Sequence, residues 1–205
     1  MIKQFNELAN AKRTEKTISA LKENGINAFL VETKEQAKEK VLQMIPKGAE
    51  VFSMTSITLE AMGIPKEINE SKNYDSVRNK LISMTSQNQS REMQKLGSAP
   101  DWTIGSVHAV TEDGKLMIAS NTGSQLPAYA YGAENVIFLV GTQKIVKNME
   151  QGFERIYNHS LPLESERAKK AYGIERSNVS KILIINKEIQ QNRITLIFIN
   201  EILGF

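Results

Sequence analysis

The sequence predicts an α/β fold: one domain over residues 1–205, with a mostly parallel sheet and an inserted antiparallel hairpin. Strand-like and helix-like segments alternate along the chain, as they do in sheets whose strands are joined by helical crossovers. The apolar run NVIFLVG at 135–141 is typical of a strand that is buried on both faces. In the stretch 107–120, two β-type runs flank Asp113-Gly114, a pair that suits a tight type I′ hairpin turn.

The first part of the chain contains a clear strand–helix–strand unit. Thr33 and Gln36 have the spacing of a capping box, and apolar residues follow at helical spacing until Pro46 ends the helix. A polar helix before this unit ends at Gly25, a residue suited to a left-handed C-terminal cap. The unit implies a parallel pair of strands joined by a right-handed crossover. The expected elements are helices over 5–24 and 33–45 and strands over 26–32 and 50–54.

The rest of the chain continues the alternation around the hairpin. We expect a short helix whose N-cap is Thr55 or Ser56. Helical spacing of apolar residues indicates another helix near 149–157. Pro162 suits the first turn of a further helix, which Gly173 ends. The remaining expectations are a helical stretch over 74–96, a loop over 97–102, and strands over 181–186 and 193–200.

Composition excludes several classes of function. The chain is 40% hydrophobic and 24% charged, as soluble proteins are, and its net charge of +3 comes from lysines interspersed with acids. We therefore expect no nucleic-acid partner. The absence of cysteine excludes disulfides, thiolate catalysis and an iron–sulfur cluster held by this chain. No segment has the apolar core of a signal peptide or the about 20 apolar residues of a membrane span, so we expect a cytoplasmic protein without membrane contact.

Three polar loops follow predicted strands, where open α/β sheets usually bind ligands. They cover 53–56, 121–125 and 141–144. In the second loop Gly123 permits close backbone approach, so the loop suits a small anionic metabolite that carries a carboxylate or phosphate group. Alternatively, this loop caps its own backbone, and the third is an ordinary turn with a solvated lysine. The candidate ligand-binding residues are Ser53, Thr55, Ser56, Asn121, Thr122, Gly123, Ser124, Gln125, Gly141, Thr142 and Lys144.

Two residues of the hairpin are the candidates for acid–base catalysis, namely His108 and Glu112. Their spacing along a strand separates them by about 13 Å, so they do not pair directly. A structural histidine is the alternative. The two histidines of the chain have no ligand spacing with other residues, and we expect no metal. Glu164 and Arg167 lie one helical turn apart and form either a surface ion pair or part of the wall of a ligand cleft.

Three segments of the sequence resemble a known family. SVHAVTEDGKLMIASNTGSQLPAYAYGAENVIFLVGTQKIV is followed by IYNHSLPLESERAKKAYG and by the final EILGF. Together they resemble the LUD (lactate utilisation) domain family, in particular lactate utilization protein C and YkgG-like proteins. The resemblance is densest over 102–173 and includes His108, Glu112 and the loop 121–125.

The resemblance implies a fold similar to the NagB/RpiA/CoA-transferase-like group. It also implies a link to the oxidation of L-lactate to pyruvate, beside iron–sulfur partner subunits. Three functions stay open: a small-molecule enzyme or enzyme subunit, an accessory subunit, and CoA-transferase-like acyl transfer with Glu112 as the nucleophile. An accessory subunit would dock onto redox partners or onto a second copy through LPAYAYGA at 126–133, because tyrosine is common at interfaces. The sequence does not identify a cofactor.

Overall fold

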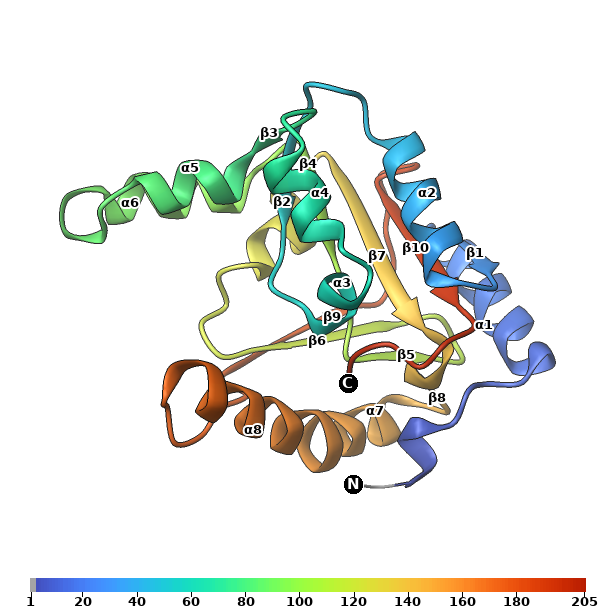
Figure 1. Cartoon of the computed structure of the whole chain (residues 1–205). Coiled ribbons are helices and arrows are strands. Elements are labelled where there is room, and N and C mark those ends of the chain that lie inside the picture. The colour runs from blue at the N-terminus through green and yellow to red at the C-terminus, as the bar shows by residue number, and fades with distance from the viewer. Residues whose placement is uncertain (1–2) are drawn as a thin grey trace.

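A six-stranded sheet, parallel throughout, forms the larger layer of the fold in a computed structural model that describes residues 3–205 (Figure 1). Its order is β1-β10-β7-β4-β2-β3. The strands are β1 (Asn27–Val31), β2 (Glu50–Ser53), β3 (Asp75–Ser76), β4 (Trp102–Gly105), β7 (Asn135–Gly141) and β10 (Ile194–Ile199). The α/β class with a mostly parallel sheet is therefore confirmed.

A second sheet of four strands contains the hairpin, and its order is β8-β5-β6-β9. The strands are β5 (Ala109–Thr111), β6 (Leu116–Ser120), β8 (Ile145–Val146) and β9 (Lys181–Ile185). β6 is antiparallel to β5 and β9, whereas β5 and β8 are parallel. Figure 1 shows that β7 points toward this sheet, so the sheet lies at the carboxyl ends of the parallel strands.

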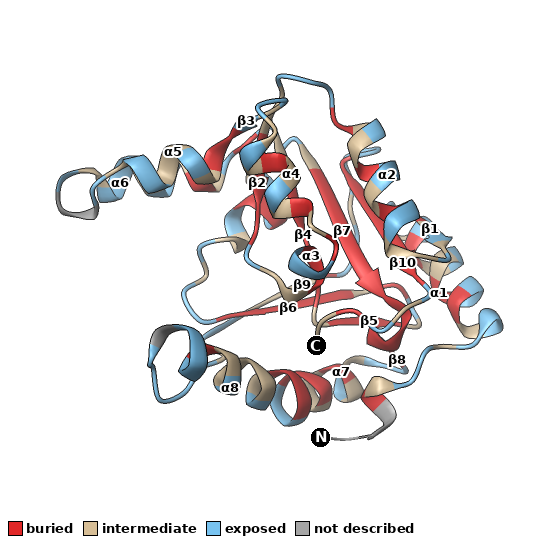
Figure 2. Cartoon of the chain, in the orientation of Figure 1, coloured by how far each residue is buried: buried red, intermediate tan, exposed pale blue. Residues whose placement is uncertain are grey.

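The helices cover both sheets. They are α1 (Ala11–Glu23), α2 (Lys34–Met44), α3 (Ile57–Ala61), α4 (Ile64–Glu70), α5 (Val77–Ser83), α6 (Ser86–Ser98), α7 (Met149–Arg155) and α8 (Leu161–Tyr172). Short 3-10 turns lie at η1 (Lys3–Asn6) and η3 (Thr142–Lys144), and π-helical turns at η2 (Ala128–Gly132) and η4 (Ile156–Ser160). Figure 2 shows α5 and α6 as an arm that projects from the body with much exposed surface. No helix within residues 3–205 has the length and apolar character needed to cross a bilayer.

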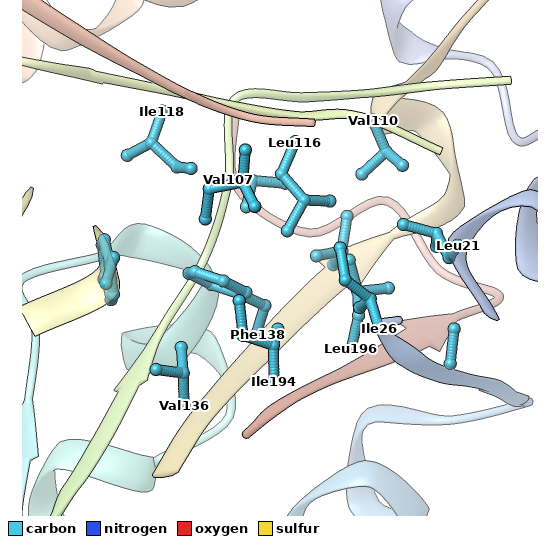
Figure 3. Close-up of a cluster of buried hydrophobic side chains, with 14 of the residues drawn as sticks. Leu21, Ile26, Val107, Val110, Leu116, Ile118, Val136, Phe138, Ile194 and Leu196 are labelled. Atoms are coloured by element: carbon cyan, nitrogen blue, oxygen red, sulfur yellow. The ribbon is translucent and has the colours of Figure 1, made fainter. Parts of the chain in front are cut away.

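The apolar runs of β7 and β10 are explained by cores on both faces of the large sheet. On β7, Ile137 and Leu139 pack with α2, α3 and α4, while Val136 and Phe138 face the second sheet. Figure 3 shows the second core, in which side chains of β5 and β6 meet those of β7 and β10. A third core lies between the second sheet and α7, where Gly152 permits close approach: a Cβ there would lie 2.2 Å from the sulfur of Met117.

Most local predictions are confirmed. Thr33 accepts a hydrogen bond from the Gln36 N–H in a complete capping box. Ser56 is the N-cap residue of α3, although its side chain makes no capping hydrogen bond. Gly173 takes a left-handed conformation at the end of α8. The first helix is shorter than predicted, because Asn10 caps it and it begins at Ala11.

Two predictions about connections are wrong. The strands of the first unit are parallel but not neighbours, since β10, β7 and β4 separate β1 from β2. The predicted antiparallel hairpin is present as β5 and β6, and it pairs with β8 and β9 in the second sheet. The helices before and after Pro162 are one continuous helix: the backbone of Ser160 stays helical, and η4 joins α7 to α8.

Two local predictions also need correction. The sequence predicts a loop over residues 97–102, yet α6 extends to Ser98 and β4 begins at Trp102. β4 has only four residues, too few for a periodic pattern. The turn at Asp113-Gly114 is not type I′, because among the described residues of this turn only Gly114 has a positive φ, of 80°. It is a three-residue turn of the type I plus G1 bulge kind, closed by the Gly114 N–H donating to Thr111 O at 2.8 Å.

Candidate functional site

A cavity of about 920 Å³ opens beyond the carboxyl ends of β2, β4 and β6. The segments that follow these three strands form its base. Helices α5 and α6 of the arm form one wall, and α8 with the segment 177–179 contributes to the lining as well. Cavities of this size hold small metabolites and cofactors. The position at strand ends is the one expected for a ligand site in an open α/β sheet.

Two of the three predicted loops line this cavity with more than one residue. Residues 121–125 line it together with Thr55 and Ser56. Part of the second loop also forms hydrogen bonds within its own segment. Ser120 Oγ accepts from the Gly123 N–H at 2.8 Å and donates to Gln125 Oε1 at 3.0 Å. The self-capping and cavity-lining interpretations therefore both hold. The internal hydrogen bonds give the loop a defined shape on the cavity wall.

Ser53 occupies a different position from the rest of its loop. It is fully buried, and it is not among the residues that line the cavity. Its carbonyl oxygen accepts from Nε and Nη2 of Arg78, at 3.1 and 2.9 Å. Arg78 also donates to Thr55 Oγ1 at 3.1 Å and lines the cavity. Ser53 thus acts through its backbone, by holding a guanidinium group at the cavity wall.

The third loop contributes one residue to the cavity, Lys144. Gly141 and Thr142 are buried outside the lining, and Gln143 donates from Nε2 to the carbonyl oxygen of Leu203 at 3.0 Å. The alternative of a solvated lysine is wrong, because Lys144 is only 2% exposed. This loop is therefore a buried turn that places one amine at the cavity.

Lys144 has three hydrogen-bond partners, and all of them line the cavity. Its Nζ lies 3.2 Å from Thr58 Oγ1, 3.1 Å from Ser106 Oγ and 3.2 Å from the carbonyl oxygen of Val107. Burial lowers the pKa of Lys144 well below its ordinary value, and the charge of Arg155 lowers it further. None of the ion pairs in the described part of the chain includes this lysine.

His108 lines the cavity as well, and it is a neutral hydrogen-bonding group. Burial, followed by the charges of Lys144 and Arg155, lowers its pKa to about 3. Its Nδ1 accepts a hydrogen bond from the Ala119 N–H at 3.1 Å. Because a neutral imidazole has one N–H, the proton is on Nε2. At neutral pH the side chain therefore offers a donor, and it holds a proton too weakly to act as a strong base.

Glu112 lies away from the cavity lining, so the hairpin does not bring the two acid–base candidates together. Its carboxylate bridges two cations of α1, with Arg13 Nε at 2.7 Å and Lys16 Nζ at 2.9 Å. Burial opposes ionisation of Glu112, but the hydrogen bonds from Lys16 and Arg13 outweigh it and lower the pKa. The residue is therefore an ionised anchor between α1 and the hairpin.

Three arginines at the cavity were not among the predicted ligand-binding residues. Arg78 and Arg91 come from the arm, and Arg167 comes from α8, where Glu164 pairs with it through two contacts of 2.7 and 2.8 Å. The predicted Glu164–Arg167 pair is thus present, and it belongs to the cavity wall. The arm arginines carried no signal in the sequence beyond their charge, because a polar helical stretch normally faces solvent.

Behind this wall a fourth arginine is completely buried. Arg155 Nη1 donates to the carbonyl oxygen of His108 at 2.6 Å and to Ser160 Oγ at 3.1 Å. Its burial lowers its pKa to about 10, so it stays charged at neutral pH. The described residues contain no group of three or more histidine or carboxylate side chains suited to a metal ion.

The geometry defines an α/β protein with a metabolite-sized cavity at the carboxyl edge of a parallel sheet. The LUD domain model matches residues 14–199, and the chain belongs to the LUD domain family. The crystal structure of a DUF162 family protein from Deinococcus radiodurans is similar in fold. It has a TM-score of 0.57 and 10% identity, and the match covers 95% of this chain and 100% of that one.

A second solved structure, eIF2B delta from Chaetomium thermophilum, matches with a TM-score of 0.35 and 15% identity. This match covers 60% of the present chain and 54% of the other. The comparison with curated proteins gives no match.

Proposed function

We propose that the cavity binds a small anionic metabolite, a carboxylate or phosphate compound of organic-acid metabolism. The charge of its lining carries this proposal. Among the described side chains that line the cavity, Arg78, Arg91 and Arg167 are arginines, while Glu164 is the one carboxylate and is paired with Arg167. Guanidinium groups bind carboxylate and phosphate oxygens through paired hydrogen bonds, and a lining of one charge sign attracts ligands of the other.

Lactate and pyruvate are the first ligands to test, because the loop and hairpin segments resemble lactate utilization protein C and YkgG-like proteins. A ligand of that size would occupy part of the cavity of about 920 Å³ and leave room for a second group. Acyl transfer through Glu112 receives no support from geometry, since this residue is ion-paired with Arg13 and Lys16 away from the cavity lining.

An accessory role is the second candidate function, and one side chain favours it. Tyr131 is 89% exposed in the segment 126–133, whereas Tyr129 of the same segment is buried. An exposed tyrosine beside the cavity-lining residues Gln125 and Pro127 suits an interface anchor. Its partner would be an iron–sulfur redox subunit, or a second copy of this chain. Mass measurement of the protein purified alone, and of its Tyr131→Ala variant, tests the self-association.

Thermal unfolding with anions tests the main proposal. Lactate, pyruvate and phosphate are each added at concentrations matched in ionic strength by sodium chloride. A ligand at about 100 times its Kd stabilises the native state by about 2.7 kcal/mol, which raises the Tm by several degrees. We expect the Arg91→Gln variant to bind roughly tenfold more weakly, because a hydrogen-bonded charge is lost from the wall.

The matched control is Arg176→Gln, which removes the same charge from an exposed residue outside the lining. The control should keep the wild-type response to the anion. The proposal is wrong if no anion stabilises the protein beyond sodium chloride, or if both variants lose the response equally.

A further inference from the structure

The cavity contains a buried amine without an acidic partner, which is an unusual group for a protein interior. Lys144 Nζ contacts Thr58, Ser106 and Val107, three residues that also line the cavity. Structural buried lysines are normally neutralised by a carboxylate. The described ion pairs include none with Lys144, and the one charge that affects its pKa from nearby is the guanidinium of Arg155.

The hydrogen bonds around Nζ match the needs of a neutral amine. The carbonyl oxygen of Val107 can only accept. Thr58 Oγ1 donates to the carbonyl oxygen of Leu203 at 3.1 Å, so it accepts from Nζ. These two acceptors use the two N–H groups of a neutral amine. The third partner is the hydroxyl of Ser106, which accepts from Nζ at 3.1 Å and, by rotating, can instead donate to the lone pair of a neutral amine.

We propose that Lys144 is a nucleophilic lysine, whose amine forms a reversible imine with an anionic aldehyde or ketone in the cavity. The nitrogen lone pair attacks the carbonyl carbon, a C–N bond forms, and one N–H proton moves to the carbonyl oxygen to give a carbinolamine. The carbinolamine then loses hydroxide with a proton as water, and the C=N bond of the imine replaces the C–O bond. Water reverses both steps, so no oxidant or reductant is needed.

Neighbouring groups assist this step by their positions. The hydroxyl of the half-buried Ser106 lies 3.1 Å from Nζ and reaches the cavity, so it can pass a proton between nitrogen and oxygen. His108 offers its Nε2–H from the same wall, which suits a hydrogen bond to a carbonyl oxygen. Burial and the charge of Arg155 lower the pKa of Lys144, and this keeps the nucleophilic form available near neutral pH.

The chemical class of the substrate follows from the whole lining. The imine requires a carbonyl group, and the arginines on α5, α6 and α8 favour a carboxylate or phosphate on the same molecule. A 2-oxo acid is the smallest compound with both groups. This inference rests on the proposed binding of an anionic metabolite, and it adds which part of the ligand bonds to the protein.

Reductive trapping tests the proposal in the intact chain of 205 residues. The protein is incubated at neutral pH with sodium pyruvate and sodium borohydride, digested, and mapped by mass spectrometry. Borohydride reduces the imine to a stable secondary amine, so the adduct identifies the lysine. We expect at least about tenfold more adduct on Lys144 than on Lys147, because Lys147 is exposed and lies outside the cavity lining, away from the arginines that hold the anion. Sodium lactate, which has no ketone or aldehyde group, should give no adduct.

Matched variants complete the test. Lys144→Arg should abolish the adduct, whereas Lys147→Arg, three residues away and exposed, should leave it unchanged. Ser106→Ala keeps the amine and should slow trapping, and it provides a second variant if Lys144→Arg does not fold. Adducts spread over exposed lysines, or none at all, would overturn the imine. If pyruvate still raises the Tm in that case, the proposed anion binding stands while the imine fails; if neither occurs, both fail.

Discussion

At the scale of single residues, charged and polar groups in the interior organise the region behind the cavity. Arg155 is fully buried and bonds to the backbone of His108, and His159 is buried beside the ring of Phe5, with 5.6 Å between ring centroids. The charge of Arg155 lowers the affinity of both His108 and His159 for protons. The neutral histidine at the cavity is therefore a product of burial, assisted by the charge of Arg155, and not of a partner acid.

His159 should make the fold sensitive to acid. Burial, followed by the charge of Arg155, lowers its pKa to about 4, while the unfolded chain has an ordinary value near 6.5. The unfolded state therefore binds more protons between these two values, and stability falls as pH drops through that window. At pH 5 the cost is about 2 kcal/mol relative to pH 7 or above.

Urea unfolding of the wild type and of His159→Gln, at pH 7 and at pH 5, measures this cost. We expect the loss of unfolding free energy on acidification to be smaller in the variant by about 2 kcal/mol, because glutamine does not titrate. Equal pH dependence in the two proteins would contradict the assignment.

Single residues also show where a sequence pattern stops being informative. Lys144 was predicted as a ligand-binding residue because it follows a strand, yet its burial and its missing acid depend on packing from α3 and from the segment after β4. Glu112 is a carboxylic acid of the kind that serves in acid–base catalysis. However, Lys16 of α1, 96 residues away in the sequence, forms an ion pair with its carboxylate. Local sequence does not contain such distant neighbours.

At the scale of elements, helix ends depend on glycine for two different reasons. Gly25 follows α1 with φ of 77°, and a Cβ there would lie 2.0 Å from the carbonyl oxygen of Glu188. Gly173 ends α8 with φ of 69°, and nothing lies within 4 Å of its added Cβ. The two positions share the left-handed backbone but differ in the space around them.

Replacing each of these two glycines by alanine distinguishes the energetic cost of the left-handed backbone from the cost of a steric clash. Gly173→Ala should cost about 1 kcal/mol of unfolding free energy, the ordinary penalty of a left-handed alanine. Gly25→Ala should cost roughly 3 kcal/mol, because the clash with Glu188 adds an overpacking term. Chemical denaturation of both variants gives the comparison, and equal costs would show that the chain after α1 shifts without strain.

The long helix formed by α7, η4 and α8 shows how elements merge. Pro162 signals a helix start because it lacks an N–H donor. Here η4 precedes the proline with a helical backbone, and the Leu161 N–H donates to Ile156 O, a bond of the π-helical kind. The proline is thus accommodated one residue after a π-turn, in the middle of a continuous helix.

At the scale of the whole molecule, the two sheets share one core and should unfold together. Phe138 of β7 is fully buried between them and packs edge-on against Tyr129, with 4.8 Å between ring centroids. Phe138→Ala should cost about 3 to 5 kcal/mol, as large-to-small changes in cores do. Ile189→Ala, at a side chain that is 90% exposed, should change stability by less than about 0.5 kcal/mol.

Two spectroscopic probes decide whether the sheets are cooperative. Far-ultraviolet circular dichroism reports both sheets, and the fluorescence of Trp102 reports β4 of the large sheet. The two transitions should coincide in the wild type and in Phe138→Ala. Separate transitions in the variant would mean that the second sheet is an independent unit.

Sequence by itself determined the α/β class, most helices and strands, the capping box at Thr33 and the polar loops at strand ends. These features depend on neighbours within a few residues, through periodicity, caps and turns. Only the tertiary structure decided that β10, β7 and β4 lie between β1 and β2, that the hairpin joins β9, and that the arm arginines and a buried amine share a cavity. Strand order and burial are set by packing between segments far apart in the chain, so the polar loop 121–125 acquires its chemical surroundings only when the chain has folded.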